Sequence, residues 1–153
     1  MNKHIAKHLD QTFTRNSKSR RYSHCVIARP SEAEAERRID SHYAVESGTR
    51  SYNYYCSDEA YSYNWIGGDR KTVFGTTYHS PAEFKADFPD LPSFLTRCRE
   101  ERVADFEKAR AAGEFDTYGC VGWCGRYDLA VKLLNKTLGT YYDSVIILDA
   151  EIL

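Results

Sequence analysis

The stretch YGCVGWCGRYDLAVKLLNKTLGTYYDSVIILDAEIL, residues 118–153, decides the fold of this chain. A short β-prone run at residues 120–123 is interrupted at Gly125, and apolar side chains then recur at helical spacing over residues 127–138. Residues 144–148 follow with four consecutive branched apolar side chains, a pattern typical of a strand covered on both faces. A strand, a helix and a strand of these lengths predict two parallel strands joined by a right-handed crossover.

The whole chain, residues 1–153, is predicted to form one α/β domain of the mixed α+β kind. Its 153 residues are 42% hydrophobic, which is enough to bury one core but not two full domains. We expect a mixed sheet containing residues 22–28, 119–123 and 144–150. The last of these strands is the most apolar, so it is expected near the centre of the sheet.

The N-terminal segment, residues 1–20, is polar and basic. Residues 1–24 contain six lysines and arginines against one aspartate, whereas the chain as a whole has a formal net charge of −1. Ile5, Leu9 and Phe13 are spaced one helical turn apart. We therefore expect a short helix on the body of the protein or a basic arm that touches a partner. The near-neutral total gives no sign of a broad nucleic-acid footprint.

Two capping patterns predict further helices. Ser31 followed by Glu34 forms a capping box, and the helix that it starts is expected to end near Gly48. The sequence SPAE at residues 80–83 places a serine cap before a proline, which predicts a second helix start. A longer helix is expected over residues 93–112.

Residues 49–79 depart most from an average composition, since they hold half of the twelve tyrosines and one of the two tryptophans. Aromatic and polar residues alternate there, which predicts a three-stranded antiparallel meander inserted after the first helix. We expect at least two of Tyr61, Tyr63 and Trp65 to be exposed and to need a covering partner. The predicted partner-binding residues are Tyr52, Tyr54, Tyr61, Tyr63, Trp65, Arg70 and Lys71.

The cysteine pattern points to reduced thiols. Five widely spaced cysteines without an apolar export signal predict a cytoplasmic protein. Cys120 and Cys124 alone are close in sequence, and their spacing without a second Cys/His pair does not match a zinc site. No segment approaches the ~20 apolar residues of a membrane helix. We therefore expect no metal, no cofactor and no membrane span.

A glycine-rich loop follows the strand at residues 119–123. Gly122, Gly125 and Arg126 are candidates for binding an anion or a nucleotide, because backbone amides at a helix N-terminus attract negative charge. The spacing matches neither the dinucleotide fingerprint nor a P-loop, and Asp128 in the first helical turn would repel an anion. Close packing of the backbone around Trp123 is the alternative explanation for the glycines.

Cys124 is the candidate nucleophile of the chain. It lies near the same helix N-terminus and next to Arg126, where the pKa of a thiol would be lowered. Catalysis would also need a base, and only the fold could bring His24 or His79 near. Free cysteines are most often small buried apolar residues. No catalytic residue is therefore assigned, and the sequence favours a protein that is not an enzyme.

Two short stretches, RYSHCV at residues 21–26 and WCGRYDLA at residues 123–130, resemble small uncharacterised proteins from bacteriophage genomes. The resemblance implies a phage or prophage accessory protein acting in the cytosol of a bacterial host. Inhibitors of host defence systems are frequent in that group. Most such inhibitors bind and block a host protein, whereas some degrade or sequester a nucleotide signal.

These features are compatible with three functions. The first is a non-enzymatic inhibitor that blocks a host macromolecule through an aromatic surface. The second is nucleotide or nucleic-acid binding by stacking aromatics, with the glycine loop or the basic N-terminal segment holding phosphates. The third is a small hydrolase that uses Cys124 and a histidine. Exposed aromatics could also be covered by a second copy of the chain, giving a homo-oligomer.

Overall fold

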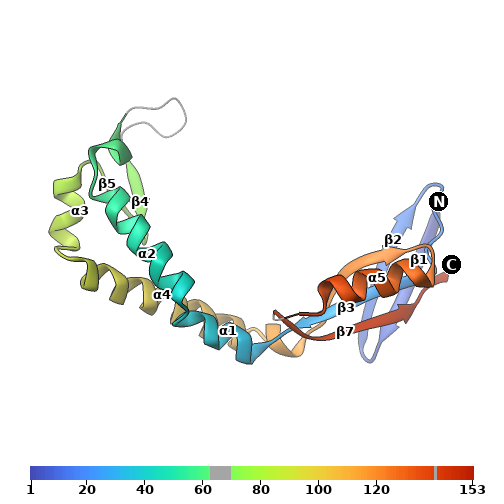
Figure 1. Ribbon diagram of the computed structural model, residues 1–153. Coiled ribbons are helices and arrows are strands. Elements are labelled where there is room, and N and C mark those ends of the chain that lie inside the picture. Colours follow the sequence, from blue (N-terminus) through green and yellow to red (C-terminus); the bar gives the residue numbers. More distant parts are fainter. Residues whose placement is uncertain (63–69, 140) are drawn as a thin grey trace. The chain divides into compact units, whose positions relative to one another are not determined.

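Figure 1 shows the computed structural model, which describes residues 1–62, 70–139 and 141–153. Helices and short sheets follow one another along the chain, so the expected mixed α+β class is confirmed. Every strand pair among the described residues is antiparallel. No helix in this part of the chain is long and apolar enough to cross a membrane.

The contacts between residues divide the chain into two compact units. Unit 1 comprises residues 1–36 and 106–153, and unit 2 comprises residues 37–105. Unit 2 is therefore an insertion in the sequence of unit 1. It is longer than the tyrosine-rich segment at residues 49–79, which it contains. Helices α1 (Glu32–Ile39) and α4 (Leu91–Ala111) each begin in one unit and end in the other.

Unit 1 begins with a β-hairpin of β1 (Asn2–His8) and β2 (Gln11–Ser17), so the helix expected over residues 1–20 is wrong. The reason is that the same segment also has the two-residue periodicity of a β-strand. His4 and Ala6 are both buried while their neighbours face outward, which is the alternation of a strand. Strand β1 also pairs with the C-terminal β8 (Glu151–Ile152), a long-range contact that overrides local helical spacing.

The main sheet of unit 1 has the order β6-β3-β7. Strand β3 (His24–Pro30) is central, with β6 (Gly119–Cys124) on one side and β7 (Tyr142–Asp149) on the other. The three predicted strands are thus correct. The expected mixed pairing, with the last strand near the centre, is wrong. β6 and β7 run parallel, but each pairs antiparallel with β3 between them.

Both faces of β3 are covered. Helix α5 (Tyr127–Thr137) packs on β3, β6 and β7 from one side (Figure 1). On the other side Cys25 and Ile27 join Ala6 of the hairpin and Leu148 of β7 in one apolar core. The four residues from Cys25 to Ala28 are all nearly inaccessible, because successive side chains alternate between the two covered faces.

Unit 2 is built around an aromatic core rather than a meander. It contains α2 (His42–Tyr55), the 3-10 turn η1 (Asp58–Tyr61), the hairpin of β4 (Lys71–Val73) and β5 (Thr76–Tyr78), and α3 (Pro81–Asp87), together with most of α4. The three-stranded meander is therefore wrong over the described residues. Ser41 starts α2 by accepting a hydrogen bond from the Ala44 amide at 3.2 Å, and this helix continues through Tyr52 and Tyr54.

The predicted helix starts are confirmed. The Ser31 hydroxyl accepts a hydrogen bond from the Glu34 amide at 3.1 Å, and the Ser80 hydroxyl accepts one from the Glu83 amide at 3.2 Å. Gly48, expected at a helix end, instead lies inside α2. An added Cβ there would be 2.7 Å from Leu95 Cδ2 of α4, so this glycine allows two helices of unit 2 to approach closely.

Candidate binding site

The tyrosine-rich segment mainly supplies the core of unit 2. Tyr61 is only 7% exposed, and its hydroxyl donates a hydrogen bond to the Tyr55 carbonyl at 2.8 Å. The expectation that Tyr61 is an exposed contact is therefore wrong, because the 3-10 turn η1 directs its ring inward. Tyr63 and Trp65 lie outside the described residues.

Two other predicted contact residues on α2 have different environments. Tyr52 is half-buried, with its hydroxyl donating to the Phe88 carbonyl at 3.1 Å and its ring packed against Phe84. Tyr54 is 42% exposed, and the ammonium of Lys71 lies 5.9 Å from its ring centroid. Arg70 is exposed next to Lys71. Among the described candidates, only Tyr54 and Arg70 are thus exposed on unit 2, and Lys71 is half-buried beside them.

The glycine loop of unit 1 is explained by close packing. A Cβ on Gly122 would be 2.9 Å from Leu133 Cδ2, and one on Gly125 would be 3.3 Å from the Arg21 carbonyl oxygen. Arg126 forms an ion pair with Asp128 at 3.2 Å across the first turn of α5. The glycines therefore let the backbone and α5 come together, as the alternative explanation held, and the anion-site expectation gains no support.

The fold does bring His24 next to Cys124. The two residues face each other across β3 and β6, while Asp149 faces His24 from β7. His24 Nδ1 lies 2.7 Å from Ser23 Oγ, and His24 Nε2 lies 3.5 Å from the Asp149 carboxylate. Burial raises the pKa of the Cys124 thiol, however, which is the opposite of the predicted activation. His79 belongs to unit 2.

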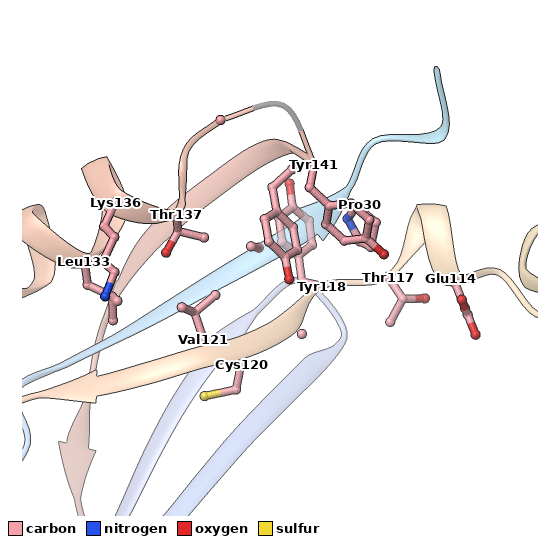
Figure 2. Close-up of a pocket in the computed structure, with 14 residues that line it drawn as sticks. Pro30, Glu114, Thr117, Tyr118, Cys120, Val121, Leu133, Lys136, Thr137 and Tyr141 are labelled. Atoms are coloured by element: carbon pink, nitrogen blue, oxygen red, sulfur yellow. The ribbon is translucent and has the colours of Figure 1, made fainter. Parts of the chain in front are cut away.

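A pocket of about 920 Å³ opens in unit 1 between the sheet and the end of α5 (Figure 2). Its volume is in the range of small-molecule binding sites. Strands β3, β6 and β7, helix α5 and the 3-10 turn η2 (Glu114–Asp116) all contribute to its walls. The lining residues are Ala28, Pro30, Glu114, Thr117, Tyr118, Gly119, Cys120, Val121, Leu133, Lys136, Thr137, Gly139, Tyr141 and Tyr142.

Tyr118 forms the fixed wall of this pocket, hereafter the Tyr118 pocket. Its backbone exchanges two hydrogen bonds with the Gln11 side chain, at 2.9 and 3.1 Å, and its hydroxyl lies 2.7 Å from Ser144 Oγ. The Arg29 guanidinium lies 5.4 Å from the ring centroid, and the His8 ring packs edge-on at 5.0 Å. Contacts on so many sides, several of them from the N-terminal hairpin, hold the ring in one orientation.

Tyr141 and Tyr142 add two further rings to the pocket. Their centroids lie 4.9 Å apart at an interplanar angle of 86°, and Tyr141 remains 42% exposed. Figure 2 shows Lys136 of α5 on one side of Tyr141 and Glu114 on the other. The Tyr118 pocket therefore has an aromatic middle, a cation towards one end and a carboxylate towards the other.

Strand β6 forms one border of the Tyr118 pocket and lies at the edge of its sheet, because its sole strand neighbour among the described residues is β3. The register shifts between Val26 and Ile27, so Val121 is an extra residue on β6. Such a bulge bends an edge strand and changes the direction of its side chains. The pocket thus adjoins a strand edge with open backbone positions.

The sequence-based candidates did not include Tyr118, Tyr141 or Tyr142. A usable signal was present, because all three lie next to the strand ends predicted at residues 119–123 and 144–150, where loops often form binding sites. The tyrosine cluster at residues 49–79 is denser and gives the stronger aromatic signal in the sequence.

Comparisons with protein families, with curated proteins and with solved structures find no match for this chain. The class that its own features define is an α+β protein with an inserted second unit and an aromatic pocket at a sheet edge.

Proposed function

We propose that this chain is a binding protein that holds an extended segment of a partner protein along β6, with one partner side chain in the Tyr118 pocket. The observation that carries the proposal is the position of a 920 Å³ aromatic pocket directly beside an edge strand. Strand addition obtains affinity from backbone hydrogen bonds and specificity from pockets that receive alternate side chains.

The chemistry of the walls indicates an apolar or aromatic side chain as the anchor. Tyrosine rings offer a large contact area at a small entropic cost, and Tyr118 is already fixed by its own hydrogen bonds. Lys136 and Glu114 flank the rings, so the neighbouring partner residues are expected to be polar or charged. We therefore place the aromatic contact surface at the Tyr118 pocket of unit 1, and not at residues 49–79, where the sequence predicted it.

Two further considerations favour binding over catalysis and a host protein over a small substrate. The raised pKa of Cys124 counts against a thiolate nucleophile at neutral pH. The resemblance to bacteriophage accessory proteins supports a partner in the cytosol of a bacterial host, which the chain would bind and block.

The pocket also favours one alternative, nucleotide binding. A base stacked on the tyrosine rings would leave its phosphate within the region of Lys136, the cation of the pocket. The C-terminal end of α5 opposes this arrangement, because the helix dipole is negative there. Nucleotide binding would weaken steeply with salt, whereas an apolar anchor would not.

Selection from a library of random linear peptides tests the main proposal. Enriched peptides are expected to bind at least about tenfold more weakly to Tyr141→Ala, because a central tyrosine contributes more than about 1.4 kcal/mol. Tyr43→Ala is the matched control, since Tyr43 is 71% exposed in unit 2 and should not affect binding. Failure to enrich any peptide, or equal binding to both variants, would contradict the proposal.

Calorimetric titration with mononucleotides and cyclic dinucleotides at two ionic strengths tests the alternative. Binding that Tyr141→Ala abolishes and that added salt weakens would replace the peptide with a nucleotide as the ligand. Heats indistinguishable from dilution would remove the alternative.

A further inference from the structure

Two thiols of unit 1 lie in contact. Cys25 Sγ on β3 is 3.8 Å from Cys120 Sγ on β6, although the residues are 95 positions apart in sequence. Cys25 is completely inaccessible, whereas Cys120 is exposed at the sheet edge. One thiol can therefore meet a dissolved reagent while its neighbour is shielded from it.

The strand register creates this contact. Cys25 faces Trp123 and Ile27 faces Cys120, and residues that face each other across two strands point to the same side of the sheet. Cys25 and Ile27 both pack towards the hairpin, so Cys120 shares that face. Figure 2 shows the Cys120 side chain on the face of β6 opposite to Val121, in agreement with this register.

We propose that Cys25 and Cys120 form a redox site at which a peroxide oxidises the two thiols to a disulfide between β3 and β6. In the first step Cys120 attacks hydrogen peroxide, giving a sulfenic acid and releasing one water. In the second step the Cys25 sulfur attacks the Cys120 sulfur and displaces the sulfenic oxygen as a second water. Two thiols lose two electrons and two protons, and the peroxide is reduced to two molecules of water.

The two positions suit the two roles. Exposure makes Cys120 the thiol that reacts with peroxide, and burial makes Cys25 the thiol that resolves the sulfenic acid. Burial, followed by the proximity of Cys120, raises the pKa of Cys25 to about 12. The second step should therefore be slow near neutral pH and become faster as the pH rises, because the thiolate is the attacking species.

Closing the bond requires a modest movement. The sulfurs must approach from 3.8 Å to the ~2.05 Å of a disulfide, a change within reach of side-chain rotation and a small shift of the bulged edge strand. The resulting covalent loop would contain the whole of unit 2, residues 37–105. It would also fix the strand that borders the Tyr118 pocket.

The experiment treats the full chain with hydrogen peroxide, removes the peroxide with catalase, blocks remaining thiols under denaturing conditions and maps the digest by mass spectrometry. A link between the peptides of Cys25 and Cys120, with the loss of two hydrogen atoms and full reversal by dithiothreitol, is expected. Cys56 and Cys98 of unit 2 are internal controls and should remain blocked as free thiols.

Two variants test which cysteines form the disulfide. Cys124→Ser should keep it, because Cys124 is not part of the contact, whereas Cys120→Ser should lose it with an unchanged circular dichroism spectrum. Cys120 is exposed, so this substitution is not expected to disturb folding. A Cys25–Cys124 link would overturn the proposal. So would Cys120 recovered as sulfinic acid with Cys25 still free.

Discussion

His4 is a fully buried polar side chain of unit 1, so its ring nitrogens need hydrogen-bond partners inside the protein. Its Nε2 accepts a hydrogen bond from the Tyr22 amide at 3.0 Å, and its Nδ1 lies 3.2 Å from the Arg15 carbonyl oxygen. With Nε2 as acceptor, Nδ1 carries the proton and donates to that carbonyl. One imidazole therefore satisfies two backbone groups from different segments of the chain.

Replacing His4 with phenylalanine should lower the free energy of unfolding of unit 1 by about 1–3 kcal/mol. The aromatic volume is kept, but the Tyr22 amide and the Arg15 carbonyl lose their partner inside the protein. Urea unfolding followed by fluorescence of Trp123, whose ring lies 6.4 Å from that of His4, measures the loss. An unchanged midpoint would mean that water or a neighbouring group satisfies both backbone atoms.

Tyr78 makes the stability of unit 2 depend on pH in the alkaline range. Its burial, followed by a 2.7 Å hydrogen bond to Asp87, raises the pKa of its phenol to about 12. The ordinary pKa of tyrosine is ~10, so the folded state holds the proton more tightly than the unfolded state. This contribution to stability is complete below about pH 10 and is lost as the pH rises towards 12.

We therefore expect the unfolding midpoint of unit 2 to fall between about pH 10 and pH 12, and to fall less in Tyr78→Phe. Burial also raises the pKa values of Tyr55 and Tyr61, so the slope should be reduced rather than abolished. Urea titrations at a series of pH values provide the measurement. Equal slopes for the wild type and Tyr78→Phe would show that Tyr78 is not responsible.

At the scale of helices and strands, the sequence predicts correctly those features that depend on local chemistry. The caps at Ser31 and Ser80 and the strands flanking α5 were predicted because their signals are contained within a few residues. The N-terminal hairpin was missed because helical spacing and strand alternation coexist in that segment, and its pairing with the C-terminal β8 lies far away in sequence. The central place of β3 was missed because it depends on pairing with residues more than 90 positions away. The predicted strands did not reveal the pocket either, because its walls come from segments that are far apart in sequence.

The contact between β6 and α5 can be tested with two glycines of one strand. Gly122→Ala should destabilise unit 1 by about 1–3 kcal/mol, because its Cβ would lie 2.9 Å from Leu133 Cδ2. Gly119→Ala is the matched control, as nothing lies within 4 Å of the added atom. Chemical denaturation of both variants is the measurement. Equal stability of the two would contradict the packing role of Gly122.

At the scale of the whole molecule, each unit has its own apolar core. The core of unit 2 is largely aromatic and includes Phe84 and Phe94, whereas that of unit 1 joins Cys25, Ile27 and Leu148. Composition did indicate that residues 49–79 differ from the rest of the chain. It did not indicate a second core, because tyrosines on a helix and tyrosines on an exposed strand have the same composition.

Phe84→Ala should destabilise unit 2 selectively, by about 3–5 kcal/mol, because Phe84 is fully buried among aromatic rings. Hydrogen exchange read by mass spectrometry should then show loss of protection in residues 42–55 and 81–87, with residues 24–30 little changed. Tyr43→Ala, at an exposed position of α2, is the control. Equal loss of protection in both units would show that they unfold together.

The order of the strands in unit 1 has a consequence for biosynthesis. Strand β3 leaves the ribosome about 90 residues before Gly119 begins the first of its two sheet neighbours. At translation rates of roughly 5–20 residues per second, that interval is on the order of 5–20 s. The nascent chain therefore carries the apolar run from Cys25 to Ala28 without its native strand partners while all of unit 2 is being made. That interval makes β3 the segment that a ribosome-associated chaperone would be expected to shield.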